Sequence, residues 1–392
     1  MPVTEHASHG AVMNNLKSLL LASSFLFLMS SCDFGTGLFS DDENEDENTE
    51  KGQSTPSGTE NQTKTDTIPF VRVPKIPDYK LPEETFADDL EKEASEIIDH
   101  AIEKAIAYVS VMKDSRHSSV SYPYDEDADG YISALDTKEL EIYRDIVSAA
   151  KAGQPFSISE SEYDGELMGA YFPISEALRS VDPDLSSYVK LTGDIYITGD
   201  LVSHYRDLHL VYYDPYTNPN KTVLKGDVTQ DEVDHSAALL DRVIKRVVRF
   251  MPEGLSTYDK YYYLAAVLSE QTDYDRDTGV SITAFKALIT GTAVCEGYAS
   301  AYVLLCREAN LWVGYKNGFS SFSGEGHIWN LIKLEDGIYN IDVTWGDGAG
   351  KPYQIEWYDY FIKSDELFED NGHEQMTGLA STGTYAPCPY EE

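Results

Sequence analysis

Residues 291–306 of this 392-residue chain read GTAVCEGYASAYVLLC and place a thiol near the start of a predicted helix. After Cys295, apolar residues recur at helical spacing, and Gly291 and Thr292 before it could end a loop and cap the helix. The unpaired amides and the dipole at a helix start favour an anion, which lowers the pKa of a thiol there. The stretch therefore predicts a reactive cysteine. The alternative is a small buried residue that serves only packing.

Cys306 is a second cysteine on the same predicted helix. It follows Cys295 by eleven positions, about three turns and ~16 Å along the same face. That distance excludes a disulfide between the two side chains. Cys306 is therefore predicted to be a core residue.

Two predicted strands follow, GHIWNLIKL and IYNIDVTW, on either side of the turn EDG. His327 begins the first strand and Asp342 lies within the second. In the register that pairs Lys333 with Ile338, Asp342 faces Trp329. His327 is then the diagonal neighbour of Asp342, about 7–8 Å away between backbones and within side-chain reach. A slip of one residue would place the two on opposite faces.

A thiol at a helix start, with a histidine and an aspartate on adjacent strands, supplies a nucleophile, a base and an orienting carboxylate. The segments VCEGYASAYVLLCREANL, GHIWNLIKLEDGIYNIDVTW and YFIKSDELF resemble the transglutaminase-like superfamily, in its bacterial branch, over about residues 255–370. The resemblance implies that Cys295 is the nucleophile, His327 the base and Asp342 the orienting carboxylate, with no cofactor required for catalysis. Trp329 and Asn330 match the family's HxWN stretch. They are expected to shape the cleft, with ordinary strand packing as the alternative.

The resemblance also implies an α+β fold with a papain-like transglutaminase core, in which N-terminal helices pack on an antiparallel sheet. We expect this domain at residues 230–392, with helices at about 230–251 and from Ser256 onward. Helical periodicity at 85–113 and 137–151, and alternation between 189 and 212, predict a small α+β region at 70–229 before it.

The N-terminus carries a predicted targeting signal. Residues 19–29, LLLASSFLFLM, have the length of a signal-peptide core and are too short for a membrane span of ~20 residues. The junction that ends at Cys32 resembles a bacterial lipobox, which implies lipidation of Cys32 in a signal peptide at 1–32. An ordinary secretory signal with a chance cysteine is the alternative. Met13 is a second candidate start, because residues 1–12 show no targeting pattern.

Residues 33–69 include DDENEDEN and almost no apolar side chains, so they are predicted to be a disordered acidic linker. Together with a lipid at Cys32, this linker predicts attachment to a membrane in the cell envelope, outside the cytoplasm. The chain has 68 acidic and 30 basic residues, a formal net charge of -38. Nucleic acid is therefore an unsuitable partner, because binding phosphates requires a basic surface.

Residues 125–136, DEDADGYISALD, resemble an EF-hand calcium loop, with a helix available after the loop. The candidate ligands are Asp125, Asp127, Asp129, Tyr131 and Asp136. The segment before the loop is not helical and its twelfth position is Asp rather than Glu, so the alternative is a solvated acidic turn.

These features predict a membrane-anchored lipoprotein that transfers acyl groups through a cysteine, with a peptide or protein as substrate. The bond attacked would be a peptide or glutamine amide. Water as the acceptor makes such a protein a protease or amidase, and an amine makes it a cross-linker. The alternative is a non-catalytic transglutaminase-like module that binds a peptide, a glycan or a cell-envelope partner.

Overall fold

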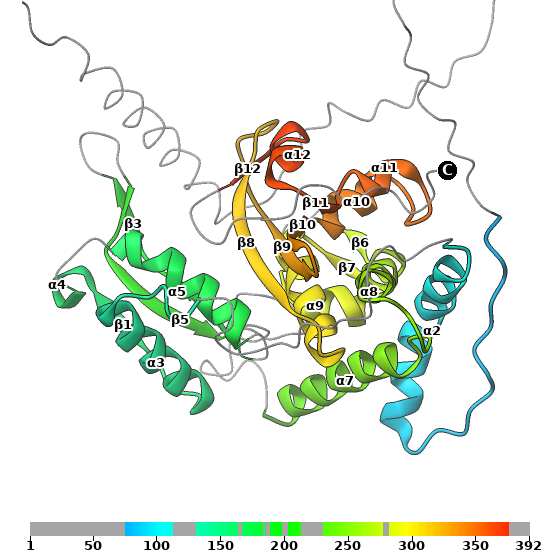
Figure 1. The fold of residues 1–392 in the computed structure, drawn as a ribbon. Coiled ribbons are helices and arrows are strands. Elements are labelled where there is room, and N and C mark those ends of the chain that lie inside the picture. The colour runs from blue at the N-terminus through cyan, green and yellow to red at the C-terminus, as the bar shows by residue number, and fades with distance from the viewer. Residues whose placement is uncertain are drawn as a thin grey trace, which may run out of the picture.

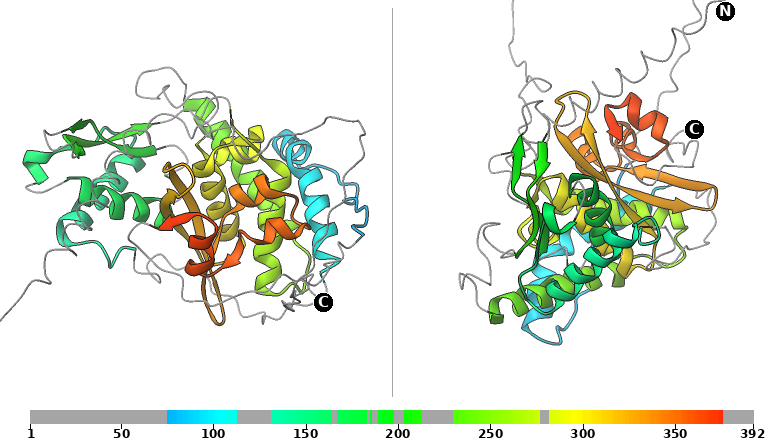
Figure 2. Two further views of the ribbon diagram at one scale, coloured as in Figure 1. Left: turned by 90° about the horizontal axis from the view of Figure 1, so that it is seen from above. Right: turned by 90° about the vertical axis from the view of Figure 1, so that its left-hand side faces the viewer.

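The computed structural model of the protein describes residues 75–112, 131–163, 167–182, 185, 189–197, 203–212, 230–276 and 282–375. Within these ranges the chain forms two packing units, each around its own apolar core (Figures 1 and 2). The predicted signal peptide, Cys32 and the 33–69 linker lie outside the described residues. None of the described helices is both long and apolar enough to cross a membrane.

The smaller unit, formed by the described residues between 131 and 212, combines helices with a three-stranded sheet. Its two longer helices are α3 (Thr137–Lys151) and α5 (Leu167–Val181). The strand order is β1 (Ser157–Ser159), β5 (Asp207–Tyr212), β2 (Val189–Thr192). The short helix α4 (Glu160–Tyr163) and a hairpin of β3 (Ile195–Ile197) with β4 (Ser203–Tyr205) complete the unit. α3 begins at its predicted position because Asp136 and Glu139 form a reciprocal capping box.

The larger unit, formed by residues 75–112 and 230–375, is built on a five-stranded antiparallel sheet. The strand order is β11 (Phe361–Lys363), β10 (Gly337–Ile341), β9 (Gly326–Leu334), β8 (Val313–Ser320), β12 (His373–Gln375). Lys333 pairs with Ile338, so the predicted register is confirmed. The second predicted strand was too long, because β10 ends at Ile341 and Asp342 caps α10 (Val343–Ala349).

Helices cover this sheet, with one in direct contact and others packed on it (Figure 1). α9 (Cys295–Glu308) contacts β8 and β9, and α8 (Thr257–Gln271) and α7 (Gln230–Arg249) pack on α9. α8 carries three consecutive buried tyrosines, Tyr261, Tyr262 and Tyr263. Each hydroxyl donates to a backbone carbonyl, at distances of 2.6, 2.8 and 3.0 Å, so burial leaves none of them unsatisfied. These hydrogen bonds tie α8 to the segments around it.

Helix α2 (Asp89–Val109) belongs to the larger unit, although the sequence placed it in a region spanning 70–229. Its apolar side chains, among them Ile98 and Ile102, are fully buried in the core of the larger unit. Arg246 of α7 donates to both carboxylate oxygens of Asp99 on α2, at 2.6 and 3.0 Å. The described residues between 75 and 212 therefore contribute to both apolar cores. The α+β class is confirmed, with mixed helices and strands in both units.

The remaining elements of the larger unit are short. They are β6 (Asp273–Tyr274), η2 (Lys286–Thr290), β7 (Thr292–Ala293), α11 (Ile355–Tyr358) and α12 (Asp365–Asp370). β6 and β7 pair in parallel and lead the chain into α9.

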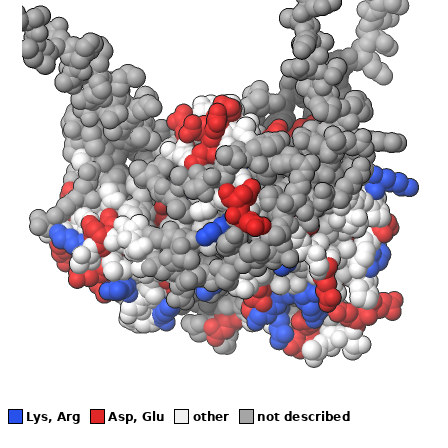
Figure 3. All heavy atoms as spheres, in the orientation of Figure 1, with Lys and Arg blue, Asp and Glu red and all other residues white. Residues whose placement is uncertain are grey.

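Acidic and basic side chains of the described residues are interspersed on the face drawn in Figure 3. Arginines of α7 pair with acids of α2 or of the segment before it. Arg242 lies 3.4 Å from a carboxylate oxygen of Asp88, and Arg249 lies 3.0 Å from one of Glu84. These arginines are thus partly neutralised where they lie.

Candidate active site

Cys295 is the first residue of α9, so the prediction of a thiol at a helix start is confirmed. The predicted cap was wrong. Gly291 follows η2 in a left-handed conformation, with φ 71°, and Thr292 pairs with Asp273 in the β6 and β7 ladder. Val294 occupies the N-cap position without a side-chain hydrogen bond. Strand pairing thus uses the residues expected to cap the helix.

The start of α9 is fastened to the strand that carries His327. Asn330, three residues after His327 on β9, donates its side-chain amide to the carbonyl of Ala299 in α9 at 3.2 Å and to that of Gly314 at 3.1 Å. Ala299 lies about one turn after Cys295. Both Cys295 and His327 are nearly buried, with 3% and 6% of their surfaces exposed.

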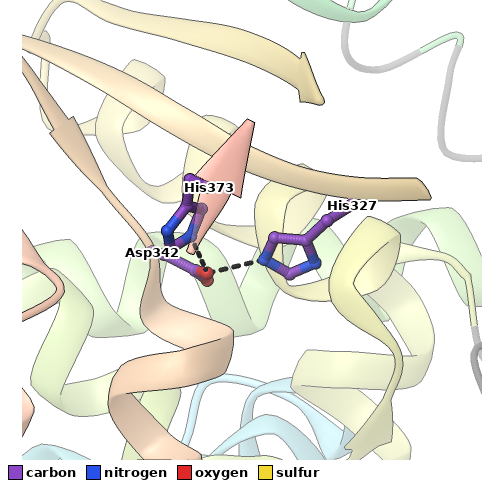
Figure 4. A group of neighbouring side chains, drawn as sticks. All are labelled: His327, Asp342 and His373. Carbon is purple, nitrogen blue, oxygen red and sulfur yellow. Dashed lines mark hydrogen bonds and ion pairs between the residues drawn. The ribbon is translucent and has the colours of Figure 1, made fainter. Parts of the chain in front are cut away.

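His327 and Asp342 are in direct contact, as Figure 4 shows. Nε2 of His327 lies 2.6 Å from Oδ2 of Asp342. Asp342 is the N-cap of α10, and its other oxygen accepts the amides of Thr344 at 2.9 Å and Trp345 at 3.1 Å. The cap therefore holds the carboxylate in one orientation and turns it toward the histidine.

Asp342 is ionised at neutral pH. Burial opposes ionisation, but the neighbouring His327 and His373 imidazoles and their hydrogen bonds outweigh it and hold the pKa of Asp342 well below its usual range. An ionised carboxylate accepts hydrogen bonds and donates none, so Nε2 of His327 carries a proton. Nδ1 of a neutral His327 is then the nitrogen that can accept a proton.

His373 of β12 is a second histidine on the same carboxylate, and it was not predicted from the sequence. Its Nε2 lies 3.0 Å from Oδ2 of Asp342, and its side chain is fully buried (Figure 4). Burial lowers the pKa of His373, although Asp342 partly opposes this effect. His373 is 31 positions after Asp342 in the sequence, and no periodic pattern links the two. Only the pairing of β12 with β8 brings them together.

Aromatic rings enclose the two histidines. Trp345 lies with its ring centroid 4.7 Å from that of His327 and 4.1 Å from that of His373. Trp329 packs on both histidines and donates its indole hydrogen to Asn340 at 2.8 Å. Phe322, in the turn between β8 and β9, stacks on the outer side of this group at 6.0 Å from Trp345 and is 66% exposed.

Trp329 and Asn330 were both expected to shape the cleft. Their side chains are buried and hydrogen bonded within the protein, Trp329 beside the histidines and Asn330 against α9. These contacts are typical of strand packing, the alternative considered above. A role in shaping the cleft stays a prediction.

Among the described residues, His327, Asp342 and His373 also form a group whose geometry could suit a metal ion. One ligand atom from each of His327, Asp342 and His373 lies within 4.8 Å of the other two. Both imidazoles, however, approach the same carboxylate oxygen at hydrogen-bond distance. We therefore interpret the group as a hydrogen-bonded triad.

Most of the predicted calcium loop lies outside the described residues, including Asp125, Asp127 and Asp129. Of the other two candidates, Asp136 caps α3 by accepting the amide of Glu139 at 2.8 Å. The hydroxyl of Tyr131 lies 3.1 Å from the carbonyl of Tyr315 and 3.2 Å from its amide nitrogen. The calcium site stays a prediction.

Comparison with known proteins matches part of the larger unit to a family. The family model of the transglutaminase-like superfamily matches residues 245–343, a range that contains Cys295, His327 and Asp342. The chain therefore contains a transglutaminase-like domain, as the sequence predicted. His373 lies beyond the matched range.

Two solved structures are similar to parts of this chain. One is a protein from Cytophaga hutchinsonii described as a "putative cysteine protease", with 12% identity, 49% of this chain and 68% of that chain covered, and a TM-score of 0.26. The other is described as a TGase, with 14% identity, 41% of this chain and 45% of that chain covered, and a TM-score of 0.24. No curated protein matches the chain.

Proposed function

We propose that this protein is a cysteine-dependent acyl-transfer enzyme that acts on peptide or glutamine amide bonds. The single observation that carries the proposal is the contact of His327 with an ionised, capped Asp342, in a domain whose nucleophile helix begins at Cys295. A nucleophile, a base and an orienting carboxylate are the parts such chemistry needs.

In the proposed reaction, Nδ1 of His327 takes the proton of the Cys295 thiol, and the thiolate attacks the carbonyl carbon of the amide. Asp342 holds the imidazole in the required tautomer and stabilises the imidazolium. Backbone amides of the first turn of α9 would donate to the oxyanion. His327 then gives its proton to the leaving amine, and a thioester to Cys295 remains.

The thioester is resolved by a second acceptor, with Nδ1 of His327 accepting the proton of that acceptor. Water releases a carboxylic acid and makes the protein a protease or amidase. An amine forms a new amide and makes it a cross-linker. The near-complete burial of Cys295 and His327 supports a site from which bulk water is largely excluded, which leaves time for an amine to react.

The exposed ring of Phe322 supports a preference for substrates with an apolar residue beside the amide that is attacked. It is the more exposed of the two large apolar side chains found on the described surface, and it stacks on the tryptophan that contacts His327. An exposed aromatic ring binds apolar side chains by burying their surface.

Substrate profiling tests the proposal directly. The protein is incubated with peptide libraries that differ beside a scissile amide or a glutamine, with and without a primary amine probe. We expect cleavage or amine incorporation that is lost in Cys295→Ala, and a preference for apolar neighbours that is lost in Phe322→Ser. The control is Tyr79→Ser, which removes the other exposed aromatic ring.

One observation favours the alternative of a non-catalytic module. Cys295 has only 3% of its surface exposed, so a substrate reaches the sulfur only if the site opens. Iodoacetamide labelling separates the two functions, since Cys306 on the same helix is an internal reference for a buried thiol. Labelling of Cys295 much faster than Cys306 supports the enzyme, and equally slow labelling of both supports the binding module.

We also propose that the protein is held at a membrane of the cell envelope by a lipid on Cys32. The support is the short apolar run and the lipobox-like junction in the sequence. Radiolabelled palmitate should enter the native protein and be absent from Cys32→Ser. An unlipidated protein in its native host would contradict this attachment.

Calcium binding at residues 125–136 is a separate proposal. Calcium at millimolar concentration should raise the melting temperature through binding to the folded state, and the double variant Asp125→Ala and Asp129→Ala should abolish the rise. The cap that Asp136 provides to α3 is unaffected in that variant, because Asp136 is unchanged. No calcium-dependent rise in the unaltered protein would leave the loop a solvated turn.

A further inference from the structure

An arginine of the smaller unit contacts the first turn of α9, the helix that begins at Cys295. Nη2 of Arg179, on α5, lies 2.5 Å from Oε1 of Glu296, the residue directly after Cys295. The two side chains are 10% and 16% exposed. The pair joins residues 117 positions apart in the sequence and belongs to both packing units.

Further contacts fix the position of the Arg179 guanidinium. Its Nη1 donates to the hydroxyl of Tyr315 on β8 at 3.3 Å, and its Cζ lies 5.1 Å from the centroid of the Tyr315 ring. One turn earlier on α5, Glu176 accepts the side-chain amide of Asn317 at 2.9 Å. α5 is thus anchored to the strand beside β9, and Arg179 is held at a fixed place over α9.

The charge of Glu296 matters because it lies one residue from the proposed nucleophile. A carboxylate in the first turn suits the helix dipole, but a second negative charge so close disfavours the Cys295 thiolate. A guanidinium in contact with Glu296 offsets that charge and stays cationic at every relevant pH.

Other ionisable groups also lie around the first turn of α9, on the elements packed against it. They are Tyr315 on β8, His327 on β9, Asp342 and Asp347 at α10, and Asp273 and Asp275 in and after β6. The aspartates can only add negative charge, and burial raises the pKa of Tyr315 and keeps its hydroxyl neutral. Among these groups and Glu296, Arg179 supplies the permanent positive charge.

We propose that Arg179 is a positioning residue for the cysteine site: by neutralising and orienting Glu296, the smaller unit makes the first turn of α9 favourable for the Cys295 thiolate. The proposal rests on the proposed function. It assigns to the smaller unit the activation of the nucleophile in the larger one. Arg179 itself touches neither the sulfur nor a substrate in this scheme.

The test is the pH dependence of Cys295 alkylation by iodoacetamide in the full chain, followed by mass spectrometry of the Cys295 peptide. Arg179→Met leaves the charge of Glu296 uncompensated and should move the midpoint up by about one pH unit, which slows alkylation about tenfold below the midpoint. Glu296→Gln leaves Arg179 uncompensated and should move the midpoint down and speed alkylation. The double variant should lie between the two single variants.

The opposite directions distinguish this role from a structural one. If the Arg179–Glu296 pair only held the two units together, both single variants should change Cys295 alkylation in the same direction. Two shifts of the midpoint with the same sign, or no shift in either variant, would therefore overturn the proposal. Arg249→Met, which breaks the pairs of Arg249 with Glu84 and Glu91 at the end of α7, is the control and should leave the midpoint unchanged. If Arg179→Met does not fold, the downward shift of Glu296→Gln decides by itself, because glutamine keeps the size of the side chain.

The same measurement separates failure of this inference from failure of the proposed function. A midpoint in the unaltered protein that is depressed and rises in His327→Ala supports the proposed function, whatever Arg179 does. A midpoint near ~8.5 that His327→Ala leaves unchanged would reject the enzyme itself.

Discussion

The two ends of helix α9 carry one cysteine each, and their surroundings differ far more than their exposure. Cys295 and Cys306 have 3% and 0% of their surfaces exposed. At the first turn lie the Arg179 pair with Glu296 and the strand that carries His327. At the last turn, burial raises the pKa of the Cys306 thiol, and a hydrogen bond with Tyr302 opposes this only in part.

Burial alone therefore does not distinguish the proposed nucleophile from the core cysteine in this protein. The difference lies in polar partners, which a helix start supplies through its amides and through neighbouring charged groups. Within the core the same thiol behaves as a small apolar side chain. Each prediction below changes one group near the first turn, and Cys306 is the internal reference.

Removal of each sulfur in turn should have the largest effect. Cys295→Ala should abolish turnover of any substrate found by profiling while the protein stays folded, because no nucleophile remains. Cys306→Ala should keep turnover and lower the free energy of unfolding by about 1 kcal/mol, since a small buried group is lost. Activity assays and chemical denaturation of both variants test this contrast. Loss of turnover in both would show that the two ends of α9 are equivalent.

Asp342→Asn should lower the rate of turnover by roughly 10²- to 10⁴-fold without abolishing it. Cys295 and His327 remain, but the imidazole loses the anion that fixes its tautomer. Alkylation of Cys295 should slow while that of Cys306 stays unchanged, and peptide mass spectrometry follows both thiols in one sample. Wild-type turnover in Asp342→Asn would remove the aspartate from the mechanism.

His373→Gln should lower turnover by about tenfold, a smaller effect, because His327 keeps its own hydrogen bond to Asp342. Glutamine can still donate to the carboxylate of Asp342, whereas His373→Ala cannot and should lower turnover further. His209→Gln is the control, since His209 forms a comparable pair with Asp207 at 3.1 Å in the smaller unit. A pH profile of turnover that is the same in His373→Gln and wild type would limit His373 to packing.

The last prediction concerns stability rather than turnover and involves Asp347, whose Oδ2 lies 2.9 Å from the hydroxyl of Tyr298 in the first turn of α9. Burial raises the pKa of Asp347 to about 7. Tyr298 also lies 2.9 Å from the carbonyl of Thr272. The Tyr298 hydroxyl has one proton and cannot donate to both Thr272 and Asp347. A protonated Asp347 can donate to the Tyr298 oxygen while Tyr298 donates to Thr272, so both hydrogen bonds form.

Between about pH 4 and pH 7 the folded protein therefore holds a proton on Asp347 that the unfolded chain has released. The free energy of unfolding should fall as the pH rises through this window. Asp347→Asn should remove this dependence and be more stable than wild type at pH 8 by roughly 2–4 kcal/mol, with little difference near pH 4. Denaturation at both pH values measures it, and equal stability at pH 8 would contradict the raised pKa.

Local patterns in the sequence predicted elements of both units. Periodicity predicted the helix at 137–151 in the smaller unit, and the start of α8 at Ser256 in the larger unit follows from a capping box, which involves residues three positions apart. The pairing of Lys333 with Ile338 follows from a short turn and alternation, so the sequence predicts His327 and Asp342 within reach of each other, and the two are in contact. Such signals survive in the sequence because they connect neighbours.

Tertiary structure decided what no local pattern encodes. α2 packs in the larger core because its apolar face contacts α7 and α8, which lie more than 120 positions later in the chain. Thr292 is a strand residue because the amides of Asp273 and Asp275 donate to the carbonyls of its two neighbours, Gly291 and Ala293. A helical or alternating pattern states which face is apolar, but not which partner will cover that face.

The sequence by itself determined the match of residues 245–343 to the transglutaminase-like superfamily and the strand register that brings His327 within reach of Asp342, because motif spacing and strand register are local properties. The contacts of His373 and Arg179 with the site were decided only by the tertiary structure. These two residues reach Asp342 and Glu296 from 31 and 117 positions away, through strand β12 and helix α5. A single polar residue in a short segment has no periodicity, so its partner is set by the packing of whole elements.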